Sequence, residues 1–371
     1  MQECKQIILP ALGRHNVCAD VILFAKGMKV ETITIKDIAK ICGVGVATVS
    51  RALNNHPDIN PETRARIMEV VEEYGFVPNN SARNLKITDS KTIAVLVKGM
   101  TNPFFMKMIG IMEEEIQAKH YSLELRHVDE KTDEVEVAME LVKEKKLRGI
   151  IFLGGLITHS TEKLEKIGIP FVLSTIPLSD ASDGNYSSVS VDDVAESRKL
   201  VNYLISKGHR KIAFMGAADA DTSIGQLRLD GYMKALEDNG IKPDSKLIWH
   251  SDDADDTYSM QNGYDMMRAK LKKKHDFTAV YAISDTMAIG ALKALREADI
   301  SVPDEVSVVG YDGIDMGTFC APTLTTLSQP FEKMARKTCE ILFDVIRHGA
   351  AHRKVIMEAE IIERETVKEI G

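Results

Sequence analysis

Short apolar runs alternate with helical patterns from residue 91 onward, and this alternation constrains the fold more than any other feature of the chain. Apolar runs of strand length occur at 92–97, 121–125, 149–153, 170–174, 211–215, 278–283 and 306–310. Helical patterns occur at 103–119, 133–145, 195–207, 227–239, 286–298 and 331–347. Apolar strands separated by helices predict doubly wound parallel sheets that helices cover on both faces. Because the strands are too numerous for one modest sheet, we expect an α/β body of two lobes.

The segment 34–76 has a different pattern, typical of a small helical domain. Thr34 is a favourable capping residue, and the apolar positions of 35–41 fall near one helical face. The glycine-containing turn 42–45 separates this helix from a second short helix at 46–54. Two short helices joined by such a turn form the helix-turn-helix pattern, in which the second helix enters the major groove of DNA.

A third helix is indicated after these two. Asn60-Pro61 places a good capping residue before a proline at the first helical position. The apolar face of this helix runs from Ile67 to Tyr74. We expect it to close a three-helix core over Ile38 and Val49, with Gly75 ending the helix.

The outer side of the second helix carries small residues at its start and one long hydrogen-bond donor, Arg51. Arginine pairs bidentately with guanine in the major groove, and small apolar side chains fit against thymine methyl groups. A DNA-reading face is the interpretation that we favour. The alternative from the pattern alone is a packing domain in which Arg51 is solvated. The face consists of Val46, Ala47, Ser50, Arg51 and Asn54.

Short motifs in this segment, and the order of elements after it, resemble the lactose-repressor/galactose-repressor (LacI/GalR) family over about residues 33–365. The motifs are Thr-Ile-Lys-Asp-Ile-Ala at 34–39, Gly-Val at 43–44, Ala-Thr-Val-Ser-Arg-Ala-Leu-Asn at 47–54, Glu-Thr-Arg at 62–64, Tyr-Gly-Phe at 74–76, Pro-Asn at 78–79 and Ala-Arg-Asn-Leu at 82–85. The resemblance implies a homodimeric transcription regulator with a helix-turn-helix head at 34–76 and a hinge at 77–90. Such a regulator binds a near-palindromic operator in double-stranded DNA, and its hinge inserts a leucine, here Leu85, into the minor groove.

The pattern and the resemblance together give one set of expected DNA-contacting residues: Thr34, Val46, Ala47, Thr48, Ser50, Arg51, Asn54, Asn79, Ser81, Arg83 and Leu85. Two positions depart from the family. Gly45 replaces the usual serine cap and is a weaker cap, and Asp58 stands where a neutral or basic residue is common, so phosphate contact should be weaker there. Residues 1–33 are expected to be an extension, with Met28 as the true start, or else a disordered arm.

The charge distribution is consistent with this reading. The chain carries 47 Lys and Arg against 55 Asp and Glu, a formal charge of −8, whereas residues 34–88 hold seven basic and six acidic residues. Phosphate would therefore repel the body and leave the head as the favourable DNA contact. The five cysteines lie far apart without metal-ligand spacing, which favours a reducing, cytoplasmic compartment with neither metal nor cofactor. No apolar run reaches the length of a membrane span, so no membrane partner is expected.

Polar and aromatic residues follow several of the expected strands. Ligands of doubly wound lobes bind beyond the carboxyl ends of the strands. Aromatic rings suit the C–H faces of a sugar, and charged or amide groups suit its hydroxyls. The expected effector-binding residues are Asn102, Phe104, Phe105, Asp193, Arg228, Tyr258, Asp285, Asp312 and Gln329. Taken singly, the two phenylalanines could equally be core residues, and the aspartates could cap helices or form turns. The resemblance favours Arg228 and Asp312 most.

The resemblance further implies a periplasmic-binding-protein-like body, with one lobe at 91–190 and 330–354 and the other at 191–329 and 355–371. The function that follows is regulation, of the repressor type, of carbohydrate metabolism genes by a small-molecule effector, a sugar, bound between the lobes. Three alternatives remain. One is a global carbon-catabolite regulator whose partner is a phosphorylated carrier protein. The others are a solute-binding protein, which the helix-turn-helix disfavours, and an enzyme, for which no phosphate loop or nucleophile elbow is found.

Overall fold

The computed structural model describes residues 34–53, 58–74, 91–129, 131–155, 159–177, 186–218, 223–251, 257–272 and 276–371. The chain divides into two compact units, Met1–Thr88 and Asp89–Gly371. We call them the head and the body and describe each by itself. The hinge segment expected at 77–90 and the extension at 1–33 lie outside the described residues.

The head contains three short helices in the expected order: α2 (Ile35–Ile41), α3 (Val46–Leu53) and α4 (Pro61–Glu73). The Asp37 carboxylate accepts hydrogen bonds from the backbone N–H of Thr34, 2.9 Å, and from its hydroxyl, 2.6 Å, which fixes the start of α2. The Asn60 side chain caps α4 by accepting from the backbone N–H of Glu62 at 2.9 Å. These contacts confirm the predicted capping residues.

Each of the three helices contributes buried side chains to the core of the head. Ile38, Val49 and Ile67 are completely buried and form a common cluster, as predicted. The prediction that Tyr74 joins this core is wrong, because its side chain is 49% exposed. Helix α4 ends at Glu73, so Tyr74 lies past the last turn and does not follow the helical face.

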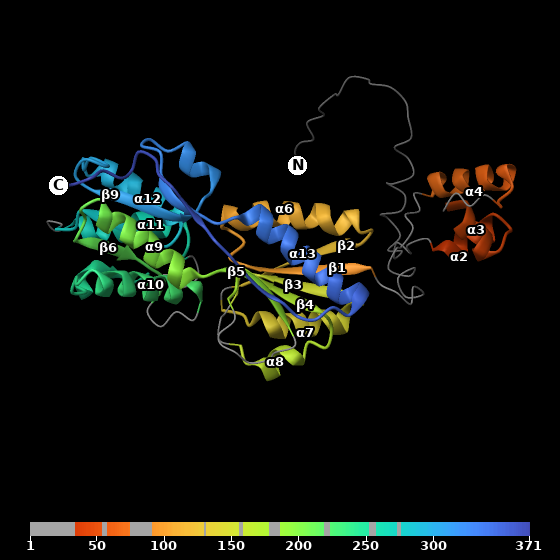
Figure 1. The fold of residues 1–371 in the computed structure, drawn as a ribbon. Coiled ribbons are helices and arrows are strands. Elements are labelled where there is room, and N and C mark those ends of the chain that lie inside the picture. Colours follow the sequence, from red (N-terminus) through yellow and green to blue (C-terminus); the bar gives the residue numbers. More distant parts are fainter. Residues whose placement is uncertain are drawn as a thin grey trace, which may run out of the picture. The chain divides into compact units, whose positions relative to one another are not determined.

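The body contains a first six-stranded sheet, in the order β11-β5-β4-β3-β1-β2, in which all neighbours are parallel. Its strands are β1 (Thr92–Lys98), β2 (Ser122–Val128), β3 (Gly149–Leu153), β4 (Phe171–Ser174), β5 (Ser187–Val191) and β11 (Lys354–Met357). Helices α6 (Pro103–Ala118) and α13 (Phe331–His348) cover one face, and α7 (Glu134–Glu144) and α8 (Thr161–Glu165) lie on the other (Figure 1). This sheet with its helices forms the first lobe.

The second lobe is built around another six-stranded sheet, in the order β12-β10-β9-β8-β6-β7. Its strands are β6 (Ile212–Met215), β7 (Ile248–Trp249), β8 (Ala279–Ala282), β9 (Ser307–Asp312), β10 (Thr325–Ser328) and β12 (Glu360–Ile362), and only β12 runs antiparallel to its neighbour. Its helices are α9 (Asp193–Ser206), α10 (Ile224–Asp238), α11 (Met260–Leu271) and α12 (Asp285–Glu297), with short 3-10 turns at Ser245–Leu247 and Asp315–Thr318. The expected two doubly wound sheets are therefore present.

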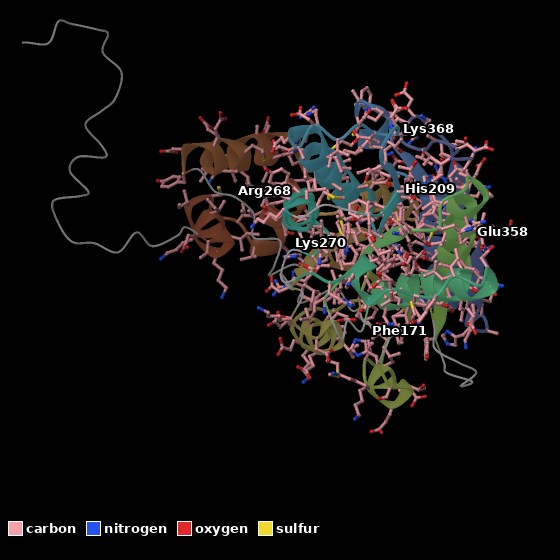
Figure 2. The ribbon with its side chains drawn as sticks, turned by 90° about the vertical axis from the view of Figure 1, so that its left-hand side faces the viewer. Phe171, His209, Arg268, Lys270, Glu358 and Lys368 are labelled. Atoms are coloured by element: carbon pink, nitrogen blue, oxygen red, sulfur yellow. The ribbon has the colours of Figure 1, made fainter. Side chains whose placement is uncertain are left out.

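The chain passes between the two sheets three times: after β5, between β10 and α13, and between β11 and β12. The expected lobe boundary at 354/355 falls inside β11, whose Met357 pairs with Val191 of β5 in the first sheet. The last crossing therefore lies at 358–359, where the exposed Glu358 is labelled in Figure 2. Because of these crossings, neither lobe is a continuous piece of sequence.

The surface of the body is rich in charged side chains, among them Arg268, Lys270 and Lys368, whereas Phe171 is buried in the first lobe (Figure 2). Among the described residues, no helix is both long and apolar enough to span a lipid bilayer. Cys42, Cys320 and Cys339 are free thiols.

Candidate functional site

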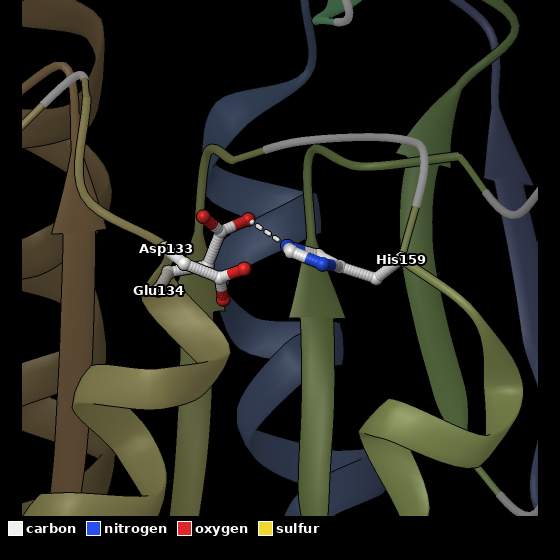
Figure 3. Close-up of side chains that lie close together, drawn as sticks. All are labelled: Asp133, Glu134 and His159. Atoms are coloured by element: carbon white, nitrogen blue, oxygen red, sulfur yellow. Dashed lines mark hydrogen bonds and ion pairs between the residues drawn. The ribbon is translucent and has the colours of Figure 1, made fainter.

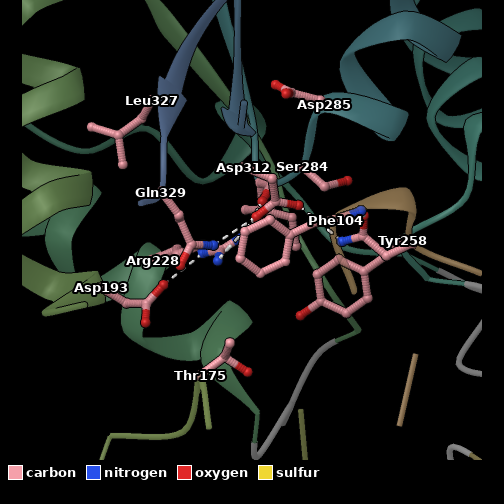
Figure 4. Close-up of polar contacts among 12 residues, drawn as sticks. Phe104, Thr175, Asp193, Arg228, Tyr258, Ser284, Asp285, Asp312, Leu327 and Gln329 are labelled. Carbon is pink, nitrogen blue, oxygen red and sulfur yellow. Dashed lines mark hydrogen bonds and ion pairs between the residues drawn. The ribbon is translucent and has the colours of Figure 1, made fainter. Parts of the chain in front are cut away.

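Arg228 lies at the centre of a buried polar cluster in the body. Its Nε donates to Asp193 Oδ1 at 2.8 Å, and its Nη2 lies 3.7 Å from Asp312 Oδ1 (Figure 4). Its guanidinium also lies 3.6 Å from the ring centroid of Tyr311, in cation–π geometry. Arg228 comes from α10 and Asp193 from the start of α9, whose close packing brings the two side chains together.

Asp312 connects this cluster to the first lobe. It ends β9 with φ of 110°, a strained value for a residue other than glycine, and its carboxylate is buried. It accepts hydrogen bonds from Gln329 Nε2 at 2.8 Å and from Asn102 Nδ2 at 2.9 Å. Asn102 belongs to the first lobe and also caps α6 by accepting from the backbone N–H of Phe104 at 3.0 Å. One side chain therefore starts a first-lobe helix and binds the second lobe.

Asp285 lies close to this cluster but faces another way. Its carboxylate accepts from the backbone N–H groups of Gly313 and Ile314, both at 2.8 Å, and from Thr326 Oγ1 at 2.6 Å. Burial, together with the nearby Asp312 carboxylate, raises the pKa of Asp285 to about 8, against the effect of these hydrogen bonds. Asp285 thus supports the turn that follows Asp312.

Aromatic side chains line the same region. Phe104 and Phe105 are buried, with ring centroids 5.6 Å apart, and they also belong to the hydrophobic core. Tyr258 is half-buried, and its hydroxyl lies 3.1 Å from Ser223 Oγ. Figure 4 shows Phe104 and Tyr258 beside the Arg228 cluster, with Thr175 on the first-lobe side.

Several residues of the cluster were missed by sequence reasoning. Thr175 follows β4 with a positive φ of 68°, and Ser284 caps α12. Ser197 Oγ donates to the backbone carbonyl of Arg228 at 2.7 Å. Thr175 directly follows an expected strand, so a stricter use of the strand-end rule would have found it. The strand-end rule does select Ser284 together with Asp285, but only Asp285 was assigned to the site. Ser197 lies inside a helix and carried no such signal.

The charges of the cluster do not balance. Burial lowers the pKa of Arg228, but the neighbouring Asp193 and Asp312 more than offset this and raise it, so the guanidinium stays charged. Burial raises the pKa of both Asp193 and Asp312, and the Arg228 charge opposes that shift. Two buried carboxylates share one guanidinium, so the cluster attracts hydrogen-bond donors and disfavours anions.

The described residues of the face that is expected to read DNA lie on α3 in the head. Val46 is 42% exposed, Ala47 and Arg51 are exposed, and Thr48 and Ser50 are half-buried. Gly45 precedes α3 and has no side chain to cap it, and its backbone carbonyl accepts from the N–H of Thr48, 2.9 Å, and of Val49, 3.2 Å. Of the other expected DNA contacts, Thr34 is exposed at the start of α2, and Asn54, Asn79, Ser81, Arg83 and Leu85 lie outside the described residues.

One group of described side chains has ligand atoms spaced as a metal ion would need. Asp133, Glu134 and His159 each place one such atom within 4.8 Å of the others (Figure 3). Lysine ammonium groups already bind both carboxylates: Lys98 lies 3.3 Å from Glu134, and Lys163 binds Asp133. A cation would have to displace these charges, so the donor set does not fit a metal ion.

Comparison with known proteins identifies both parts of the chain. Residues 34–79 match the family of bacterial regulatory proteins of the lacI type, and residues 201–367 match a periplasmic binding protein-like domain. The HTH-type transcriptional regulator MalR of Clostridium butyricum is 39% identical over 337 residues, 90% of this chain and 99% of that protein.

Solved structures agree with this result. A transcriptional regulator CelR–cellobiose complex is similar with a TM-score of 0.66 and 27% identity, covering 90% of this chain and 99% of that one. A LacI family transcriptional regulator from Enterococcus faecium with bound ribose has a TM-score of 0.65 and 26% identity, over 76% of this chain and all of that one. With a helix-turn-helix head, a two-lobed body and full-length relatives of this kind, the chain belongs to the lacI family of bacterial transcription regulators.

Proposed function

We propose that this regulator binds a near-palindromic operator as a homodimer and that a neutral sugar in the body controls this binding. The observation that most supports this proposal is the buried cluster around Asp312. Asp312 binds Arg228 and Gln329 of the second lobe and Asn102 of the first. A ligand that replaces or extends these contacts touches both lobes at once. The cellobiose and ribose in the two similar regulators support the choice of a sugar.

The charge of the cluster favours a neutral sugar over a phosphorylated one. Two buried carboxylates and one guanidinium leave an excess of negative charge, which would repel a phosphate group. Sugar hydroxyls can donate to the carboxylates and accept from the guanidinium, while Phe104 and Tyr258 offer aromatic faces. We assign contact roles to Asn102, Phe104 and Arg228 on this basis.

Control of DNA binding requires that the effector prefers one arrangement of the lobes. A ligand shifts an equilibrium only by its difference in affinity for the two states. In a homodimer, a change in the first lobes would alter the spacing of the paired segments that lead to the heads. Such a protein needs no catalytic group and acts where the chromosome is, so we infer a cytoplasmic regulator without enzymatic activity.

The proposal is tested with Asp312→Ala and the matched control Asp276→Ala, which removes an exposed carboxylate of the same lobe. A thermal-shift screen of sugars on the parent finds the effector, and operator binding is then measured with and without it. We expect Asp312→Ala to lose the effector response, whereas Asp276→Ala should respond like the parent. If Asp312→Ala responds at the same sugar concentration as Asp276→Ala, Asp312 is only a turn residue and the site is wrongly placed.

A further inference from the structure

A second buried group of charges lies in the first lobe, outside the Arg228 cluster. We call it the first-lobe charge cluster and define it as Lys98, Glu134 and His159. Lys98 ends β1 and is 6% exposed, and Glu134 begins α7 and is 2% exposed. Lys98 Nζ donates to Glu134 Oε2 at 3.3 Å and to the backbone carbonyl of Thr132 at 2.9 Å. The other carboxylate oxygen, Oε1, lies 2.8 Å from His159 Nε2 (Figure 3).

The cluster lies at the carboxyl ends of strands of the first sheet, on the same side as Phe105. Gly154 and Gly155 follow β3 with positive φ values of 71° and 140°. A Cβ on Gly154 would lie 3.1 Å from the Phe105 ring, and one on Gly155 would lie 2.5 Å from Glu134 Oε1. A side chain at either glycine would therefore collide with Phe105 or Glu134, so only the backbone of residues 154–155 separates these two side chains. The edge of a doubly wound sheet where strands end is where ligands of such lobes bind.

A purely structural role explains this cluster poorly. Burying an ion pair costs several kcal/mol per ion in desolvation, and apolar residues of similar volume stabilise a fold about as well. The start of α7 does not need Glu134, because Asp133 already caps it by accepting from Val135 N–H at 3.0 Å and Glu136 N–H at 3.2 Å.

We propose that the first-lobe charge cluster is a second hydroxyl-binding subsite, so that the effector is an oligosaccharide with at least two sugar rings. This inference rests on the proposed sugar-controlled function. The Arg228 cluster would bind one ring. The next ring would reach the cluster, where Glu134 accepts from hydroxyl groups, and Lys98 and His159 donate to them. Since the cluster pairs its carboxylate with an ammonium, it does not repel a neutral ligand.

The test is isothermal titration calorimetry on the full chain with glucose, maltose and cellobiose. The variants are Glu134→Gln and Lys98→Met, and Glu136→Gln is the matched control, because it changes an exposed glutamate of the same helix. We expect the parent to bind maltose or cellobiose at least about tenfold more tightly than glucose. Glu134→Gln and Lys98→Met should each weaken disaccharide binding by about tenfold or more and leave glucose binding nearly unchanged, whereas Glu136→Gln should behave like the parent.

Any other result overturns the inference, and the results also show whether the proposed sugar control fails with it. If the parent binds glucose as tightly as the disaccharides, or if the variants weaken both kinds of sugar equally, the subsite does not exist and the sugar-controlled function stands. A purely structural role would give equal weakening, together with a lower melting temperature. If the parent binds none of the three sugars, glucose and these disaccharides are not its effector and the inference is wrong, while the wider sugar screen still decides whether a sugar controls the protein.

Discussion

The hydrogen bond between Asn102 and Asp312 should hold the two lobes together before any effector binds. Both side chains are buried, and the acceptor is a carboxylate, so the bond contributes about 1.5–3 kcal/mol. Among the described residues, the ion pair between the lobes is that of Lys107 with Asp315, which joins a half-buried lysine to an exposed aspartate and contributes roughly 0–1 kcal/mol. Breaking the buried bond should therefore reduce the closed-to-open ratio of the ligand-free body by about 13- to 160-fold.

Two substitutions separate this contact from the capping role of Asn102. Asn102→Ser keeps a good cap for α6 but is too short to reach Asp312, and Asn102→Asp keeps the cap but places a second carboxylate against it. We expect both to open the ligand-free body, Asn102→Asp more strongly, and to weaken effector binding through the lost closed fraction together with the lost Asn102 contact. Fluorescence energy transfer between labels on α7 and α10 measures the opening. If both variants keep the parent's transfer efficiency, the bond does not hold the lobes together and our reasoning is refuted.

Two further predictions concern the head and Asp285. Arg51→Ala should cost about 1–3 kcal/mol on the cognate operator and relax the preference at one base pair per half-site; an equal loss on random DNA in a gel shift would mean that Arg51 contacts only phosphate. Because the pKa of Asp285 is raised from 3.8 to about 8, its contribution to the unfolding free energy is fully present below about pH 4 and is lost as pH rises to about 8. Asp285→Asn should remove this part of the pH slope in urea unfolding between pH 5 and 9, and parallel curves for variant and parent would contradict it.

Most of the apolar strands could be predicted from the sequence, while several strands that are polar or very short were missed. The range 149–153 agrees with β3 to the residue, and 306–310 falls close to β9, because a strand buried on both faces consists of apolar residues. β5 has the sequence Ser-Ser-Val-Ser-Val, and it is buried although three of its residues are serines. Strand β7 has only two residues, and a pattern so short carries no signal.

The candidate site could be predicted as a set of residues but not as a network. The rule that ligands lie beyond strand ends selected Asp312 and Asn102, yet the bond that joins them spans more than two hundred positions of sequence. The orientation of Asp285 depends on the turn after β9, which only the folded backbone defines. The first-lobe charge cluster was missed because Lys98, Glu134 and His159 are unremarkable singly, and only the parallel sheet brings them together.

The interrupted lobes affect how the protein is made on the ribosome. The head is complete early in synthesis, but the first lobe lacks α13 and β11 until nearly the whole chain has emerged. Synthesis of the intervening residues 192–330 takes on the order of 10 s at about 5–20 residues per second. During that time the apolar face that α13 will cover, which includes Val172 and Val189, has no partner. A nascent chain could therefore carry a finished DNA-reading head on an unfinished, aggregation-prone sensor, and chaperone binding should concentrate on chains stalled within this window.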